Sequence, residues 1–125
     1  MAMPKPYVQY QQQSVLTAPP GELTLMLYNG ALRFIKQGIA AMEQEDIAGT
    51  NSALTRAQDI ICELMTSLDL QYEVANNLLS LYDFVYRSLV LANLKKDVAV
   101  AKQCAALITE LRDTWVEAVR MTRAQ

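Results

Sequence analysis

Apolar residues recur in alternating steps of three and four along most of this chain, in four stretches separated by short polar segments. This spacing places them on one face of an α-helix, whereas a half-buried strand requires alternation of apolar and polar residues. The sequence offers no such alternation. The pattern therefore predicts an all-α fold, and the short connections favour an antiparallel up-down four-helix bundle.

Proline, Asx and charged residues divide the chain into its expected elements. Pro19 and Pro20, followed by Glu22, suit a helix start, because proline at the first helical position loses no hydrogen bond and an acid there complements the helix dipole. Asn51 and Asp69 are expected to cap the second and third helices, and Asp97 to begin the fourth. The expected helices span 19–43, 51–68, 69–93 and 97 onward. Residues 1–18 then form an irregular N-terminal arm and residues 19–125 the bundle domain.

Each expected helix has more apolar residues than one core-facing seam uses. The third seam is predicted to be Val74, Leu78, Leu81, Val85, Leu89 and Ala92, and the fourth to be Ala101, Cys104, Ile108, Leu111, Trp115 and Ala118. Apolar residues off the main seams are Ile60, Met65, Leu79, Tyr86, Val90 and Leu107, and Tyr28 belongs to a second stripe on the first helix. The surplus can form the edge of the core or line a groove that accepts a partner's amphipathic helix.

Several classes of chemistry lack the residues they need. The 125 residues contain no histidine and only four glycines, which removes the commonest general base and metal ligand and leaves no phosphate-binding loop. Cys62 and Cys104 lie far apart and have no metal-knuckle spacing. We therefore expect no enzyme, no catalytic residues, no cofactor and no metal.

Charge and hydropathy restrict the partners in the same way. A net charge of −2 argues against nucleic acid as a ligand. Leu23–Leu27 and Leu78–Leu81, the longest apolar stretches, are far too short to span a bilayer, so no membrane insertion is expected. Residues 1–13 lack the apolar core of a secretory signal, which predicts a protein that stays in the cytoplasm.

Several segments resemble the flagellin export chaperones of the FliS family. The N-terminal signature of that family is similar to YQQQSVLTAPPGELTLMLYNG at Tyr10–Gly30. Further similarity is found in AQDIICEL at Ala57–Leu64, LYDFVYRSL at Leu81–Leu89 and LRDTWVEA at Leu111–Ala118. The resemblance thus covers nearly the whole chain.

The resemblance implies a chaperone that binds the disordered C-terminal segment of flagellin one-to-one and prevents its premature polymerisation. It also implies that the loaded chaperone docks on the cytoplasmic domain of the flagellar export gate, with another flagellin regulator as a further candidate partner. Family members use the N-terminal arm as a lid over the cargo groove, and the matching residues here are Tyr7, Tyr10 and Val15.

Two readings of the apolar surplus remain open at this point. A chaperone would be a monomer or weak dimer that cargo stabilises. The alternative is a self-associating structural bundle, in which the same surface forms a homodimer interface and stability depends on protein concentration alone.

Overall fold

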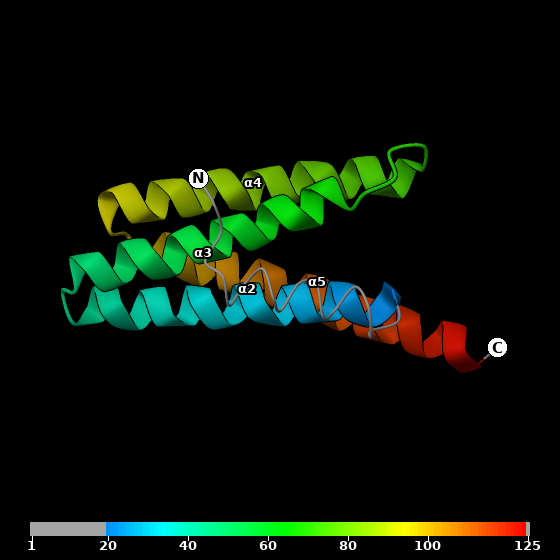
Figure 1. Cartoon of the computed structure of the whole chain (residues 1–125), viewed down its shortest axis with the longest axis horizontal. Coiled ribbons are helices and arrows are strands. Elements are labelled where there is room, and N and C mark those ends of the chain that lie inside the picture. Colours follow the sequence, from blue (N-terminus) through cyan, green and yellow to red (C-terminus); the bar gives the residue numbers. More distant parts are fainter. Residues whose placement is uncertain (1–19, 125) are drawn as a thin grey trace.

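The computed structural model describes residues 20–124, which form four helices in an up-down-up-down bundle (Figure 1). The helices are α2 (Pro20–Glu43), α3 (Ile47–Thr66), α4 (Glu73–Lys95) and α5 (Val98–Ala124). Both α2 and α4 pack against α3 and α5, so α2 and α4 occupy opposite corners of the bundle. The predicted all-α antiparallel bundle is confirmed. The expected arm, residues 1–18, lies outside the described residues.

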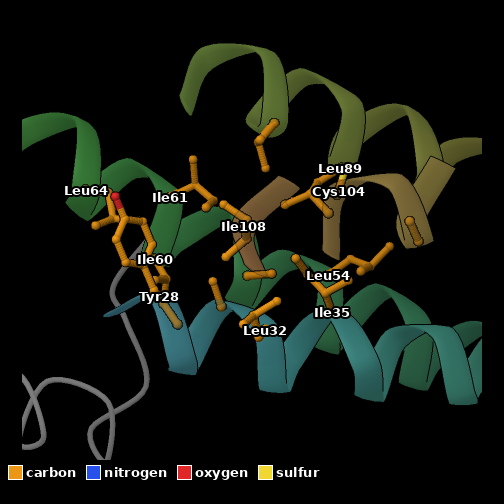
Figure 2. Close-up of a cluster of buried hydrophobic side chains, with 14 of the residues drawn as sticks. Tyr28, Leu32, Ile35, Leu54, Ile60, Ile61, Leu64, Leu89, Cys104 and Ile108 are labelled. Atoms are coloured by element: carbon orange, nitrogen blue, oxygen red, sulfur yellow. The ribbon is translucent and has the colours of Figure 1, made fainter. Parts of the chain in front are cut away.

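One continuous apolar core joins all four helices. Figure 2 shows Leu32 and Ile35 of α2 meeting Leu54 of α3, Leu89 of α4 and Ile108 of α5. Every one of these side chains is buried. The 3/4 spacing read from the sequence thus aligns with the bundle interior, and burial of this apolar surface is the main stabilising contribution.

The bundle is tightest between α2 and α3, where α2 has glycines at positions 30 and 38. A Cβ built on Gly38 would lie 2.7 Å from Cδ2 and 3.0 Å from Cγ of Leu54, and one built on Gly30 would lie 3.2 Å from Ile60 Cδ1. Glycine is therefore required at position 38 because α3 occupies the space of a side chain there.

Four of the predicted helix boundaries, both ends of the second and of the third helix, are wrong by two to four residues. The second helix begins at Ile47, because Asp46 is its N-cap and Asp46 Oδ1 accepts a hydrogen bond from the Gly49 N–H (2.9 Å). The third begins at Glu73 and continues to Lys95; Asp69 caps no helix and accepts from the Gln71 N–H in the preceding turn. The expected role of Asp97 is consistent with the Val100 N–H donating to its Oδ1 (3.3 Å).

The predicted seam of the third helix is partly wrong. Val74 and Leu81 are exposed, while the neighbouring Ala75 and Tyr82 are buried. The core side of α4 consists of Ala75, Leu78, Tyr82, Val85, Leu89 and Ala92, again in steps of three and four. In the fourth helix Ala101, Cys104 and Ile108 are buried as predicted, whereas Ala118 is exposed.

A pair of tyrosines links the two opposite helices, α2 and α4. The hydroxyls of Tyr28 and Tyr82 lie 2.5 Å apart and share a hydrogen bond, and their rings are tilted with centroids 6.3 Å apart. Both side chains are buried. Burial raises the pKa of Tyr28, and burial together with the bond to Tyr28 raises the pKa of Tyr82. The hydrogen bond between the two hydroxyls therefore gives each of them a polar partner within the buried core.

Gly38→Ala should destabilise the bundle. Overpacking of a core costs about 1–3 kcal/mol, which exceeds the gain of about 1 kcal/mol that alanine gives over glycine within a helix. Urea unfolding of both proteins measures the difference. In a Leu54→Val background the clashing Cδ2 is absent, so the same substitution should cost less. An equal cost in both backgrounds would mean that the contact with Leu54 is not responsible.

Tyr82→Phe should cost about 1–3 kcal/mol, because it leaves the Tyr28 hydroxyl buried without a partner. Adding Tyr28→Phe should recover part of that loss, since no polar group then remains unsatisfied. Tyr72→Phe, at an exposed tyrosine, is the control and should have no effect. A double variant whose loss equals the sum of the single losses would show that the hydroxyls are not coupled.

The same pair predicts a pH dependence. Because the folded pKa of both phenols is raised, the wild type keeps their full contribution below the ordinary phenol pKa of about 10 and loses it as pH rises above that value. Denaturant midpoints measured from pH 8 to pH 11 should therefore fall more steeply for the wild type than for the double phenylalanine variant.

Candidate functional site

A row of exposed apolar residues runs along one flank of α4. Val74, Leu81, Phe84 and Leu91 are 64%, 37%, 55% and 42% exposed. Their spacing is seven, three and seven, and with Asn77 and Ser88 they form a complete 3/4 repeat, which we call the outer seam. Each apolar residue of the outer seam lies one position before a residue on the core side of α4. Val74 precedes Ala75, Leu81 precedes Tyr82 and Leu91 precedes Ala92. The helix thus has two adjacent apolar seams, only one of which is used by the core.

The outer seam lies on the side of α4 that faces α5. On α2, Gly30 and Phe34 directly precede core residues and face α3, as the proximity of Gly30 to Ile60 and of Phe34 to Arg56 shows. The helices α2 and α4 run in the same direction at opposite corners of the bundle, and so do α3 and α5. A rotation by 180° about the bundle axis therefore places α2 on α4 and α3 on α5. Residues of α4 that precede core residues therefore face α5.

The α4–α5 pair leaves this flank uncovered. The two helices are the least closely packed of the four neighbouring pairs. Figure 1 shows them close together at the turn around Lys96 and diverging toward the N-terminal end of α4 and the C-terminal end of α5. Leu107, half-buried against the core, lies on the flank of α5 that faces α4 by the same geometry. The exposed outer seam of α4 and the half-buried Leu107 of α5 therefore lie along the same pair of helices, which we call the α4–α5 groove.

The outer seam contains no charged residue between Val74 and Leu91. Its two polar members, Asn77 and Ser88, are neutral. The nearby ion pair between Arg87 Nε and Asp83 Oδ2 (3.0 Å) is solvent-exposed on both sides and lies off the seam. An exposed pair of this kind contributes little to stability. The surface is therefore suited to an apolar partner, and a neutral polar residue within such a seam can fix a partner's register.

The site residues predicted from the sequence do not form one cluster in the structure. Tyr7, Tyr10 and Val15 lie outside the described residues. Tyr28 and Ile60 are core side chains, each only 1% exposed. Met65, Leu79, Tyr86 and Val90 are half-buried and directly follow core positions, which places them on the groove between α3 and α4. Leu107 alone of the set belongs to the α4–α5 groove.

The sequence reasoning missed Phe84 and Leu91 and assigned Val74 and Leu81 to the core. The sequence does contain a signal for them. Along α4, apolar residues form two patterns with steps of three and four, and the two patterns are offset by one residue. Either pattern satisfies the helical period, so the sequence does not reveal which one the bundle buries.

The described residues provide no activated nucleophile among the thiols. Burial raises the pKa of Cys104 to about 11. The pKa of Cys62 is raised by burial and by the carboxylates of Asp59 and Glu63. Both thiols are therefore protonated at neutral pH, and the thiolate is the reactive form. Within residues 20–124 no group of three acidic, thiol or imidazole side chains could hold a metal ion, and no helix there is long and apolar enough to cross a membrane.

Comparison with known proteins shows which family the sequence matches. The sequence model of the family described as "Flagellar protein FliS" matches residues 3–122. The flagellar secretion chaperone FliS of Bacillus subtilis is 44% identical over 123 residues, covering 98% of this chain and 92% of the relative.

More distant relatives have the same description. The flagellar secretion chaperone FliS of Salmonella typhimurium is 33% identical over 115 residues, covering 89% of this chain and 85% of the relative. That of Escherichia coli is 31% identical over 111 residues, covering 86% of this chain and 82% of the relative. The four-helix bundle and a match along nearly the whole length lead to one assignment: this chain belongs to the FliS family of flagellar secretion chaperones.

Proposed function

We propose that this chain binds the disordered C-terminal segment of flagellin one-to-one in the bacterial cytosol and keeps it from polymerising prematurely. The loaded chaperone then delivers its cargo to the cytoplasmic domain of the flagellar export gate. The family supports a chaperone role, and the observation that carries the proposal is the outer seam of α4, an apolar helical repeat left without a partner in the bundle.

The spacing of the outer seam favours a helical cargo. A partner helix with apolar residues in steps of three and four can pack along Val74, Leu81, Phe84 and Leu91, as helices do in coiled coils. An extended strand would match only alternate residues and would leave its own backbone groups unpaired against a helix surface. We therefore expect the cargo to gain helix as it binds.

The outer seam alone does not supply enough free energy. Covering four half-exposed apolar side chains contributes about 1 kcal/mol each, whereas ordering a disordered segment costs about 2–5 kcal/mol. The two terms nearly cancel. We infer that the cargo also covers the α3–α4 groove formed by Met65, Leu79, Tyr86 and Val90, so that it contacts α4 on both flanks.

Tyr7, Tyr10 and Val15 are proposed as a lid that competes with cargo for this apolar surface. Tyr28 and Ile60 remain proposed cargo contacts only if binding rearranges the core around them, because both are buried. A second flagellin regulator is a further candidate partner. The alternative function, a structural homodimer, would use the outer seam against a second copy of this chain.

Calorimetry and circular dichroism with a flagellin C-terminal peptide test the proposal. We expect one-to-one binding, an increase in helix and a raised melting temperature. Phe84→Ser and Leu91→Ser should each weaken binding by about tenfold, or 1.4 kcal/mol. Leu94→Ser is the matched control, because Leu94 is an exposed leucine on the same helix that lies off the outer seam.

Two results would contradict this assignment. Equal weakening by Leu94→Ser would indicate unspecific apolar adhesion. A chain that does not bind the peptide, and whose melting temperature rises with its own concentration, would favour the structural homodimer.

The lid is tested separately in the full chain by combining Tyr7→Ala, Tyr10→Ala and Val15→Ala. Weakening the lid should raise cargo affinity, because a binding surface that is covered part of the time has a reduced apparent affinity. The melting temperature of the bundle without cargo should stay the same. A reduced affinity would instead make these residues cargo contacts, and an unchanged affinity would remove the lid from the proposal.

A further inference from the structure

Two arginines from different helices stand over one phenylalanine ring. The guanidinium carbons of Arg33 on α2 and Arg56 on α3 lie 5.2 and 5.6 Å from the centroid of the Phe34 ring. Both arginines are exposed, and Phe34 is half-buried. The ring face attracts cations and restricts where each guanidinium can lie. The two positive charges are thereby held at the α2–α3 groove rather than dispersed in solvent.

These arginines differ from the others whose side chains the structure describes. Arg87, Arg112 and Arg120 each pair with a carboxylate on their own helix, at 3.0, 3.1 and 2.9 Å. Arg33 and Arg56 form no ion pair among residues 20–124. Sharing one ring places their charges within about 11 Å of each other, near the Debye length of about 8–10 Å, so their repulsion is only partly screened.

A hollow in the same groove adjoins Arg56. Its volume is about 250 Å³, and it is lined by Gln37, Ala41, Asp46, Gly49, Ser52, Ala53 and Arg56. Small residues leave the space open, and Gln37, Ser52 and Arg56 can donate hydrogen bonds into it. The carboxylate of Asp46, at the far end, is engaged by the Gly49 N–H as the cap of α3. The donors therefore gather at the end nearer the arginine pair.

We propose that the α2–α3 groove binds an acidic segment of a partner protein, with one carboxylate on Arg33 and another on Arg56. Charge complementarity supports this occupant, since two guanidinium groups without a carboxylate partner among the described residues lie over the Phe34 ring, and one of them, Arg56, also lines a hollow that contributes further donors. Planar guanidinium groups bind carboxylates in bidentate fashion. Two cations over one ring suit two separate carboxylates on a chain better than a single phosphate.

This surface lies on the opposite side of the bundle from the outer seam of α4, although it shares α3 with the α3–α4 groove that the cargo is also proposed to cover. The half-turn that exchanges α2 with α4 carries the α2–α3 groove onto the α4–α5 groove, so the two lie on opposite sides of the bundle. An acidic segment and an apolar helix could then be bound together without contact. The inference consequently goes beyond the proposed function and does not depend on it.

Nuclear magnetic resonance titration of the full chain tests the proposal, with the capped peptide acetyl-Glu-Glu-Ala-Glu-Glu-Ala-Glu-Glu-amide as the probe. Amide shifts should concentrate on residues 30–37 and 49–56, and added salt should weaken the binding. The corresponding glutamine peptide should not bind. Combining Arg33→Gln with Arg56→Gln should weaken binding of the acidic peptide by at least about tenfold.

Combining Arg87→Gln with Arg120→Gln is the matched control, because it removes the same total charge from exposed arginines elsewhere. Binding should survive in this variant. Equal weakening in both double variants would reduce the effect to net charge and overturn the proposal. Inorganic phosphate at the concentration of the peptide is the second arm, and shifts at the same residues of equal size would assign the groove to phosphate instead. Melting curves of both double variants should match the wild type, since all four side chains are exposed.

Discussion

The close approach of α2 and α3 at Gly38 determines how the other helices can be placed. Leu54 fills the space that a side chain at position 38 would occupy, so the two helices form the tightest pair of the bundle. The opposite flank of α2 is covered by α5, where the Trp115 indole N–H donates to the Gly21 carbonyl (2.8 Å). The two most closely packed helix pairs of the bundle thus both include α2, and α4 completes the bundle at the opposite corner.

Polar contacts hold α4 in place without covering its surface. The hydroxyls of Tyr28 and Tyr82 tie it to α2 through the core, and at its C-terminal end Lys96 Nζ donates to Asn51 Oδ1 of α3 (2.7 Å). Lys96 itself adopts the left-handed conformation (φ 52°) that ends the helix. These ties fix position and direction. They leave the flank toward α5 only loosely packed, which explains how an exposed apolar seam persists on a well-positioned helix.

Sequence reasoning reached the architecture because the bundle depends on period and short connections, both visible in the chain. It failed where local and tertiary signals compete. Asn51 is a good cap by type, yet Asp46 lies closer to the chain reversal and caps α3, which frees Asn51 to bind Lys96. Likewise, Leu81 and Tyr82 both fit a helical seam, and Tyr82, which is the buried one, shares a hydrogen bond with Tyr28 that the sequence does not reveal. Neither the tyrosine pair nor the arginine pair is visible in the chain order, since each joins residues of different helices.

The comparison of Phe34 with Phe84 argues that the outer seam is a specific feature rather than a consequence of bundle geometry. The half-turn relating α2 to α4 places both rings on the flank that directly precedes a core residue, Ile35 in one case and Val85 in the other. Phe34 is half-buried, and two arginines lie over its ring. Phe84 is 55% exposed, and the arginine on its own helix, Arg87, is paired with Asp83 instead. The chain thus covers an aromatic ring with its own cations at one corner of the bundle and leaves the ring at the opposite corner open. Exposed apolar surface of this kind is costly in water unless a partner removes it, so the asymmetry between the two corners supports the cargo surface proposed on α4.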